Sequence, residues 1–334
     1  MKCLRKGIGF VLAVGLILAG LSSLSSAANP EVALRYAGDL PIGNWLTRAQ
    51  EFFAKRVEVL SKERVKIEVY PAGQLFSAKD YPTAVPGGAV DMAQCALAQW
   101  SGLVPLITVL DLPLFYDGLP HIWRVLDAEA GEFLNTDFEK VGVKNLFWIQ
   151  DTSLGFASKV PLRRLEDWRG KRIRAYSELT SHTIKALGAA PAFLGGGEVY
   201  MALQRGTVEG AITGVNAMYD RKFSEVTKYV TEPGFSFAVY GALINLKKWN
   251  GLPKELQEAL LVAGKDTQEW SRKEVQKVEK ELLEELKKQG MDIYYLPKDE
   301  KARWRAACKP AYDVVTSKTG DRGQKILEFA EKMR

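Results

Sequence analysis

Several polar side chains stand where β-strands are expected to end, a position suited to contacting a small molecule. Tyr36 closes a strand that begins at Val32, and Asp39 lies in the loop after it. Gln94 ends a second strand, and Tyr176 ends a third. In a parallel sheet the carboxyl ends of the strands face the crevice in which ligands bind. These four polar residues are therefore candidate ligand contacts.

The motifs of several large enzyme classes are absent from the sequence. It has no G-x-S-x-G nucleophile elbow, no H-E-x-x-H zinc motif and no G-x-x-x-x-G-K-[ST] phosphate loop. Its two histidines, His121 and His182, are interpreted as polar residues near helix starts. The run at 195–197, three glycines, indicates a turn. We expect no catalytic residue, no metal ligand and no cofactor, although carboxylate pairs keep a secreted α/β enzyme acting on organic acids as an alternative.

Hydrophobic periodicity predicts the elements that must position these side chains. Strands are expected at 32–36, 65–70, 90–95, 145–149, 171–176, 210–213 and 238–245. Helices are expected at 46–60, 77–87, 120–138, 181–187 and 198–205, with one long helix at 253–290. This alternation is typical of α/β lobes with mostly parallel pairing. A chain of this length exceeds what one core usually serves, so we expect two lobes braced by the long helix.

The net charge gives no evidence of a nucleic-acid partner. The sequence has 46 Lys and Arg against 40 Asp and Glu, and three of the cations lie within the first six residues. Lysines and acids alternate through the second half, so no block of one sign indicates nucleic-acid binding. A slightly basic protein suits an anionic ligand.

The first residues predict secretion. Lys2, Arg5 and Lys6 precede an apolar run at 8–21, and small polar residues follow up to Ala28. This is the pattern of a signal peptide, here 1–27, and the apolar run is too short for a spanning helix. An uncleaved N-terminal anchor is the alternative.

Two cysteines would remain after cleavage. Cys95 and Cys308 stand in apolar or helical contexts far apart in the sequence. An oxidising compartment would permit a bridge between them. We expect buried free thiols.

An ordered series of motifs resembles the solute-binding proteins of tripartite ATP-independent periplasmic (TRAP) transporters, of the dicarboxylate-receptor (DctP) type. The series covers essentially the whole chain after the signal peptide and comprises VYPAGQL (69–75), VPGGAVDMA (85–93), DLPLFY (111–116), DWRGKRIR (167–174), LGAAP (187–191), EVYMALQRGTVEG (198–210) and KFSEVTKYVT (222–231). The resemblance implies two α/β lobes joined by crossing strands and a long shared helix, with the ligand in the cleft between them.

The resemblance also implies a carboxylate anchor. The family's best-known site residue is the arginine that closes the G-[KR]-x-I-R strand, which is Arg174 in this sequence. A guanidinium makes two parallel hydrogen bonds to one carboxylate and keeps its charge. Without the motif, an exposed strand arginine that balances nearby acids would be the alternative.

Three departures from the family pattern bear on the ligand. Thr213 stands where many members carry asparagine, and Asn216, one turn further on, is a candidate substitute. Gly196 occupies a position that is often aromatic, which would leave added room in the pocket. Leu154 replaces a second arginine found in members that bind diacids or acidic sugars, although Lys159 or a first-lobe cation could supply a second charge. These features predict a bulkier monocarboxylate rather than a four-carbon diacid.

The sequence therefore predicts a two-lobed, periplasmic-binding-protein-like α/β receptor. We expect residues 28–152 with about 238–265 in lobe I, and 153–237 with about 266–334 in lobe II. The expected partners are a small organic acid and the membrane permease of a TRAP transporter, and the protein is expected to be periplasmic and monomeric. A receptor for an ATP-driven importer and a sensor subunit for a membrane kinase are further alternatives.

Overall fold

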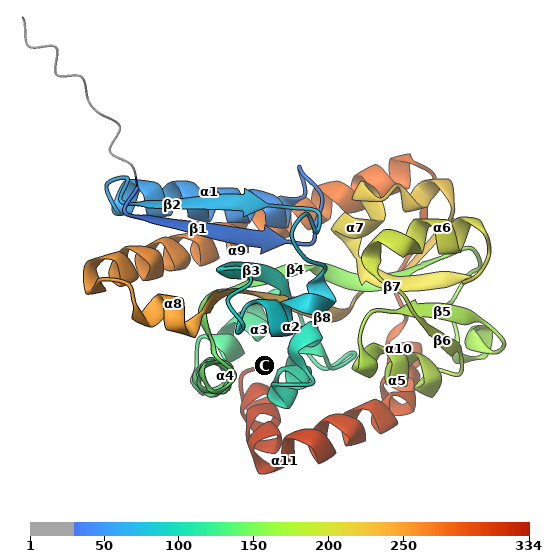
Figure 1. Cartoon of the computed structure of the whole chain (residues 1–334). Helices are drawn as coiled ribbons and strands as arrows, with labels where there is room; N and C mark the ends of the chain where they lie inside the picture. Colours follow the sequence, from blue (N-terminus) through green and yellow to red (C-terminus); the bar gives the residue numbers. More distant parts are fainter. Residues whose placement is uncertain (1–29) are drawn as a thin grey trace, which may run out of the picture.

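The computed structural model describes residues 30–334, which form two α/β lobes on one sheet (Figure 1). The predicted signal peptide lies outside the described residues. The strands of this part of the chain are β1 (Val32–Gly38), β2 (Val65–Tyr70), β3 (Met92–Ala96), β4 (Val143–Ser158), β5 (Arg172–Ala175), β6 (Ala190–Phe193), β7 (Gly210–Gly214), β8 (Tyr229–Asn245) and β9 (Asp292–Tyr294).

Helices cover both faces of this sheet. The α-helices are α1 (Trp45–Leu60), α2 (Tyr81–Ala84), α3 (Leu119–Leu126), α4 (Glu129–Lys140), α5 (Glu178–Ala186), α6 (Val199–Gln204), α7 (Val215–Asp220), α8 (Leu246–Asn250), α9 (Lys254–Lys288), α10 (Lys298–Ala307) and α11 (Lys309–Lys332). Short 3-10 helices are η1 (Ala78–Asp80), η2 (Leu97–Trp100), η3 (Pro105–Asp111), η4 (Leu165–Trp168), η5 (Gly196–Glu198) and η6 (Phe223–Glu225).

The strand order is β2-β1-β3-β8-β4-β7-β5-β6, with β9 paired to β8. Within each lobe the pairs are parallel, β1 with β2 and β3, and β5 with β6 and β7. The centre is antiparallel, because β4 and β8 run in opposite directions and join the two halves. The predicted two-lobed α/β fold is confirmed, and the lobes share one sheet.

The crossing strands β4 and β8 are longer than the sequence predicted. We expected strands at 145–149 and 238–245, whereas β4 extends to Ser158 and β8 begins at Tyr229. Pro233 and Gly234 lie within β8, and Gly234 has a φ of +104°. Such residues usually mark a turn, which is why the pattern concealed one continuous strand.

Helix predictions failed where one pattern covered two elements. The helix expected from Pro120 to about Phe138 is α3 followed by α4, separated at Asp127 and Ala128. The helix expected from Ser77 is the short pair η1 and α2. The long helix is confirmed as α9, and it packs on both β4 and α1.

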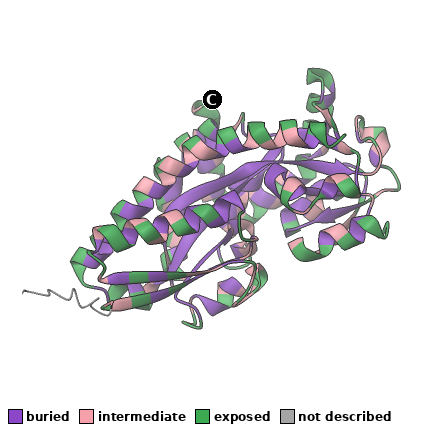
Figure 2. Cartoon of the chain, turned by 90° about the horizontal axis from the view of Figure 1, so that it is seen from above, coloured by how far each residue is buried: buried purple, intermediate pink, exposed green. Residues whose placement is uncertain are grey.

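The core follows the sheet. Figure 2 shows buried strands through the middle of the molecule and helices whose outer faces are exposed. Aromatic side chains close the second-lobe end, where Phe156 of β4, Trp168 and Trp304 of α10 stack edge to face. Cys95 and Cys308 are free and buried, as predicted. No helix within 30–334 has both the length and the apolar composition needed to cross a membrane.

Candidate ligand-binding site

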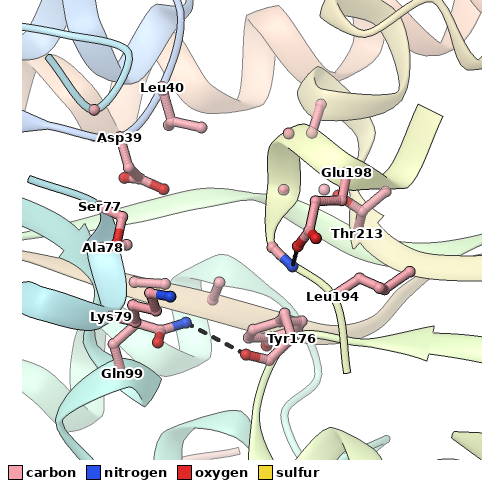
Figure 3. A pocket seen from close by; sticks show the side chains of 18 of the residues that line it. Asp39, Leu40, Ser77, Ala78, Lys79, Gln99, Tyr176, Leu194, Glu198 and Thr213 are labelled. Carbon is pink, nitrogen blue, oxygen red and sulfur yellow. Dashed lines mark hydrogen bonds between the residues drawn. The ribbon is translucent and has the colours of Figure 1, made fainter. Parts of the chain in front are cut away.

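A cavity of about 500 Å³ lies between the lobes (Figure 3). Lobe I contributes the ends of β1, β2 and β3 with η1 and η2, the crossing strands form the base, and lobe II contributes β5, the loop after β6, and α7. The lining residues are Asp39, Leu40, Ala72, Gly73, Ser77, Ala78, Lys79, Ala96, Gln99, Asp151, Leu154, Arg174, Tyr176, Phe193, Leu194, Gly195, Gly196, Gly197, Glu198, Thr213, Gly214, Ala217, Arg221, Ala238 and Tyr240.

Arg174, the predicted anchor, lines this cavity with its guanidinium held from behind. Nε donates to the carbonyl oxygen of Leu194 at 3.0 Å and Nη1 to that of Ile212 at 2.9 Å. Within the described part of the chain Arg174 has no salt bridge, and its side chain is 5% exposed. Burial and, to a smaller extent, the charge of Arg221 lower the pKa of Arg174 to about 10. At neutral pH the group remains a cation that can bind an anion without displacing a carboxylate.

Arg221 is a second cation in the cavity, and the sequence analysis missed it. A Cβ atom at Gly196 would stand only 2.6 Å from Arg221 Nη2, so the guanidinium lies directly on this glycine. The predicted room left by Gly196 is therefore filled by Arg221. Lys79 lines the opposite wall, whereas Lys159 lies at a separate surface hollow and donates to the carbonyl of Gln204. Of the two alternatives for a second charge, a first-lobe cation, Lys79, lines the cavity and Lys159 does not.

Two carboxyl groups also face the cavity, that of the buried Asp151 and that of the half-buried Asp39. Burial raises the pKa of the Asp39 carboxyl to about 6, while the charge of Arg221 lowers it in part. Burial, with a smaller effect of the charge of Asp39, raises the pKa of Asp151 to about 7, although the hydrogen bond from the amide of Thr152 lowers it in part. Glu198 is a third acid, which accepts a hydrogen bond from the amide of Gly195 at 2.7 Å.

Five of the eight predicted ligand contacts line the cavity: Asp39, Arg174, Tyr176, Gly196 and Thr213. Tyr176 has its hydroxyl near Asp111, to which it donates at 3.3 Å, and its carbonyl accepts from Gln99 of the other lobe at 3.3 Å. Leu154 also lines the cavity, as expected for the position at which the resemblance suggested a second arginine in some members.

The other three predicted contacts lie outside the cavity. The Tyr36 hydroxyl donates to Gln94 Oε1 at 3.1 Å, and Gln94 Nε2 donates to the carbonyl of Leu46 at 2.9 Å. These two side chains are buried and satisfy each other between β1, β3 and α1. Asn216 is buried beneath the base, where its Oδ1 accepts from Thr152 Oγ1 at 3.0 Å. Asn216 therefore lies behind the residues that line the cavity, next to Asp151.

The sequence contained one usable signal for the residues that were missed. Asp151 interrupts an apolar run, FWIQDTSLGFAS (147–158), that forms a fully buried strand. An acid inside such a strand needs partners or a function. Arg221 and Lys79 had no such signal, because both lie in polar segments that also fit a solvent-exposed surface.

The arrangement suits reversible binding of a charged small molecule. Within residues 30–334, no group of three or more His, Cys, Asp or Glu side chains is placed to hold a metal ion. The charged lining instead places arginines on the lobe II side and carboxyls at the end of β1 and in β4. A cavity lined by both positive and negative side chains is suited to a ligand with one anionic end and one end of different chemistry.

Comparison with known proteins gives a consistent result over almost the whole described chain. The family profile named DctP, bacterial extracellular solute-binding protein, family 7, matches residues 40–319. The C4-dicarboxylate-binding periplasmic protein DctP of Rhodobacter capsulatus is 28% identical over 288 residues, covering 85% of each chain.

Two solved structures share the fold. DctP7 of Bordetella pertussis, an extracytoplasmic solute receptor binding pyroglutamic acid, has a TM-score of 0.86 at 22% identity and covers 90% of this chain and 99% of its own. A TRAP periplasmic solute binding protein from Sulfurospirillum deleyianum with bound succinate has a TM-score of 0.84 at 26% identity and covers 91% and 100%.

Proposed function

Because the chain belongs to the DctP-type bacterial extracellular solute-binding proteins of family 7, the receptors of TRAP transporters that bind small organic acids, we propose that its own ligand is a monocarboxylate. The protein captures this acid in the cavity between its lobes and delivers it to the membrane permease of a TRAP transporter. The signal peptide predicted at 1–27 and the periplasmic location of the family support a periplasmic address.

The observation that carries this proposal is the geometry of Arg174. Its guanidinium is buried, faces the cavity, and is oriented by two main-chain carbonyls rather than by an acid. A charged group without a charged partner is costly to bury, and a ligand carboxylate offsets that cost through a bidentate pair. Thr213 and the backbone of the glycine run at 195–197 line the same side and can donate further hydrogen bonds.

The preference for one carboxylate rests on charge balance. Arg221 and Lys79 supply further cations in the lining, so the replacement of an arginine by Leu154 no longer supports a monoacid. Asp39, Asp151 and Glu198 nevertheless offset Arg174, Arg221 and Lys79 in the lining. A second carboxylate near the buried acids would meet like charges in a site of low dielectric, which opposes binding. The Bordetella receptor, which binds pyroglutamic acid, is a relative with a monocarboxylate ligand.

Ligand screening tests the receptor role. The purified protein would be mixed with an organic-acid library that includes malate, succinate and branched or aromatic 2-hydroxy and 2-oxo monoacids. A ligand at one hundred times its Kd should stabilise the protein by about 2.7 kcal/mol, which is visible as a rise in Tm. Mass spectrometry of the recovered ligand should show it unchanged, since no catalytic role is proposed for any residue.

Two outcomes would contradict different parts of the proposal. Stoichiometric or greater conversion of the ligand would replace the receptor with an enzyme acting on organic acids. Submicromolar binding of succinate or malate, with no response to monoacids, would overturn the monocarboxylate and leave the receptor standing.

A further inference from the structure

Asp39 presents an unsatisfied hydrogen-bond acceptor to the cavity. It follows the last residue of β1, and Figure 3 shows its carboxylate directed into the space between the lobes. Its Oδ1 is buried, and no group of the described residues donates a hydrogen bond to that atom. A buried acceptor without a donor costs free energy, so this position favours a ligand that supplies one.

Asp151 presents a second acceptor at the base. Its Oδ1 is occupied, because it accepts from the amide of Thr152 at 2.7 Å and from the indole of Trp45 at 3.4 Å. Its Oδ2 accepts no hydrogen bond from residues 30–334 and lies above Gly214, where a Cβ atom would stand 2.9 Å away. Any larger residue at Gly214 would press on this oxygen. The strand β7 therefore leaves Asp151 Oδ2 accessible from the cavity that it lines.

The two acceptors and the anchor come from different elements, because Asp39 follows β1 of lobe I and Asp151 lies in β4 at the base, whereas Arg174 lies in β5 of lobe II. The charge of Asp39 raises the pKa of Asp151. Neither acid forms a salt bridge with a described residue. Arg174 is instead oriented by carbonyls of lobe II. A ligand whose carboxylate is bound at Arg174 would thus meet the carboxyl oxygens of Asp39 and Asp151 on the lobe I side and at the base, where the charge of Arg221 also acts on Asp39.

We infer, granting the proposed capture of a carboxylate at Arg174, that the far end of the ligand carries hydrogen-bond donors, as a hydroxyl, an N–H or an ammonium group. Asp39 and Asp151 accept these hydrogen bonds and set the specificity of the site. An acid with a hydrocarbon tail leaves both carboxyls buried and unpartnered, and a diacid adds repulsion. Both are rejected for a physical reason, because carboxylates accept hydrogen bonds and cannot pair with one another unless protonated.

Two series of acids, matched in size, test the inference by calorimetry. The ring series is cyclohexanecarboxylate with an amino, hydroxyl, methyl or carboxylate group at carbon 4. The chain series is 4-aminobutanoate, 4-hydroxybutanoate, pentanoate and succinate. We expect the amino or hydroxyl member to bind at least 10-fold more tightly than the methyl-ended and dicarboxylate members of the same series, since a hydrogen bond to a charged group contributes about this much.

Variants separate this inference from the proposed function. Asp39→Asn and Asp151→Asn should reduce the preference for the donor-bearing acid by about 10-fold or more, with the ammonium ligand losing most because the charge is removed. Arg174→Ala should weaken every member of a series alike. Asp299→Asn, an exposed aspartate on α10, is the matched control and should change nothing. Melting curves confirm that each variant folds.

Each result has a definite consequence. Tighter binding of the methyl-ended or dicarboxylate member, or an unchanged preference in both asparagine variants, overturns the inference. If neither series binds, the test uses the acid of the organic-acid library that binds most tightly. This acid must carry a hydroxyl or N–H group, and Asp39→Asn and Asp151→Asn must weaken its binding. If no acid binds at all, the proposed function fails, and the inference fails with it.

Discussion

At the scale of single residues, Arg174 and Gly196 show how main-chain atoms shape the site. Two carbonyl oxygens hold the Arg174 guanidinium in place without neutralising its charge. Gly196 has no side chain, and Arg221 occupies the space that one would need. Both arginines therefore reach one cavity from different elements of lobe II. Arg221 can do so because Gly196 has no side chain, so this glycine helps to set the charge that a ligand meets.

Replacement of Arg174 tests the anchor directly. Arg174→Ala should weaken binding of the identified ligand by about 2–5 kcal/mol, a factor of roughly 30 to 5,000, because a buried charge pair loses one partner. Arg174→Lys should recover part of the loss, since an ammonium cannot form the planar pair of hydrogen bonds. Calorimetry on the purified variants measures both.

Arg172→Ala provides the control for this experiment. Arg172 lies two residues earlier on β5, is exposed, and donates to the carbonyl of Thr207 instead of facing the cavity. Its replacement should leave affinity unchanged. An Arg174→Ala variant that binds as tightly as the native protein would show that the anchor has been assigned to the wrong residue.

The sequence predicted individual site residues only where a motif or a strand end marked them. Arg174 and Thr213 were found because they follow conserved-looking motif positions of the family, and Asp39 because it ends a strand. Tyr36 and Gln94 fit the same strand-end rule, but their side chains bond to each other inside the core. Strand position fixes the end of the sheet at which a residue lies, whereas the direction of its side chain depends on packing that sequence does not encode locally.

At the scale of elements, the contact between α9 and β4 supports the base of the cavity from behind. Glu279 of α9 accepts hydrogen bonds from the Ser153 amide and from Ser153 Oγ, each at 2.7 Å. Burial raises the pKa of Glu279, and the two donors of Ser153 lower it in part. The register of β4 against β8 shifts between Gln150 and Ser153, so the helix supplies the acceptor that a regular ladder would have provided.

Removal of this acceptor should destabilise the protein. Glu279→Ala leaves the Ser153 amide without its partner and should lower the free energy of unfolding by about 1–3 kcal/mol. Ser153→Ala removes only the hydroxyl bond and should cost less, because the amide bond remains. Urea denaturation followed by circular dichroism compares the two.

Glu281→Ala serves as the reference, because Glu281 is an exposed glutamate on the same helix. It should lie within about 0.5 kcal/mol of the native protein. Equal stability of Glu279→Ala and Glu281→Ala would show that the contact between α9 and β4 does not contribute to folding.

Elements with one uninterrupted pattern were predicted well, and those crossing between environments were not. The strand at 65–70 and the long helix agree closely with β2 and α9, since each keeps one periodicity along its length. The second half of β4 and the first half of β8 were missed because they contain Asp151, Pro233 and Gly234, residues that normally end a strand. Asp151 lines the cavity, where local preference is subordinate to the site, whereas Pro233 and Gly234 line a separate hollow beside α9.

At the scale of the whole molecule, two long strands of the sheet join the lobes. Only β4 and β8 pass along the sheet from one half to the other, and both are irregular near the middle. Ser153 of β4 pairs with Phe237 of β8 at this point. We propose that the chain divides between the lobes here, which agrees with the boundaries predicted at 152–153 and 237–238, and that this pair marks the hinge.

Ligand binding should therefore close the molecule. The cavity is lined from both lobes, so a ligand that contacts both stabilises the closed arrangement over the open one by the difference in its contacts. Small-angle scattering of the protein with saturating ligand should give a smaller radius of gyration than the ligand-free protein. The Arg174→Ala variant, measured at the same ligand concentration, should retain the ligand-free value because it binds too weakly to close. Superimposable profiles for the free and loaded native protein would show that β4 and β8 act as a rigid support, and that the ligand enters and leaves a cavity of fixed shape.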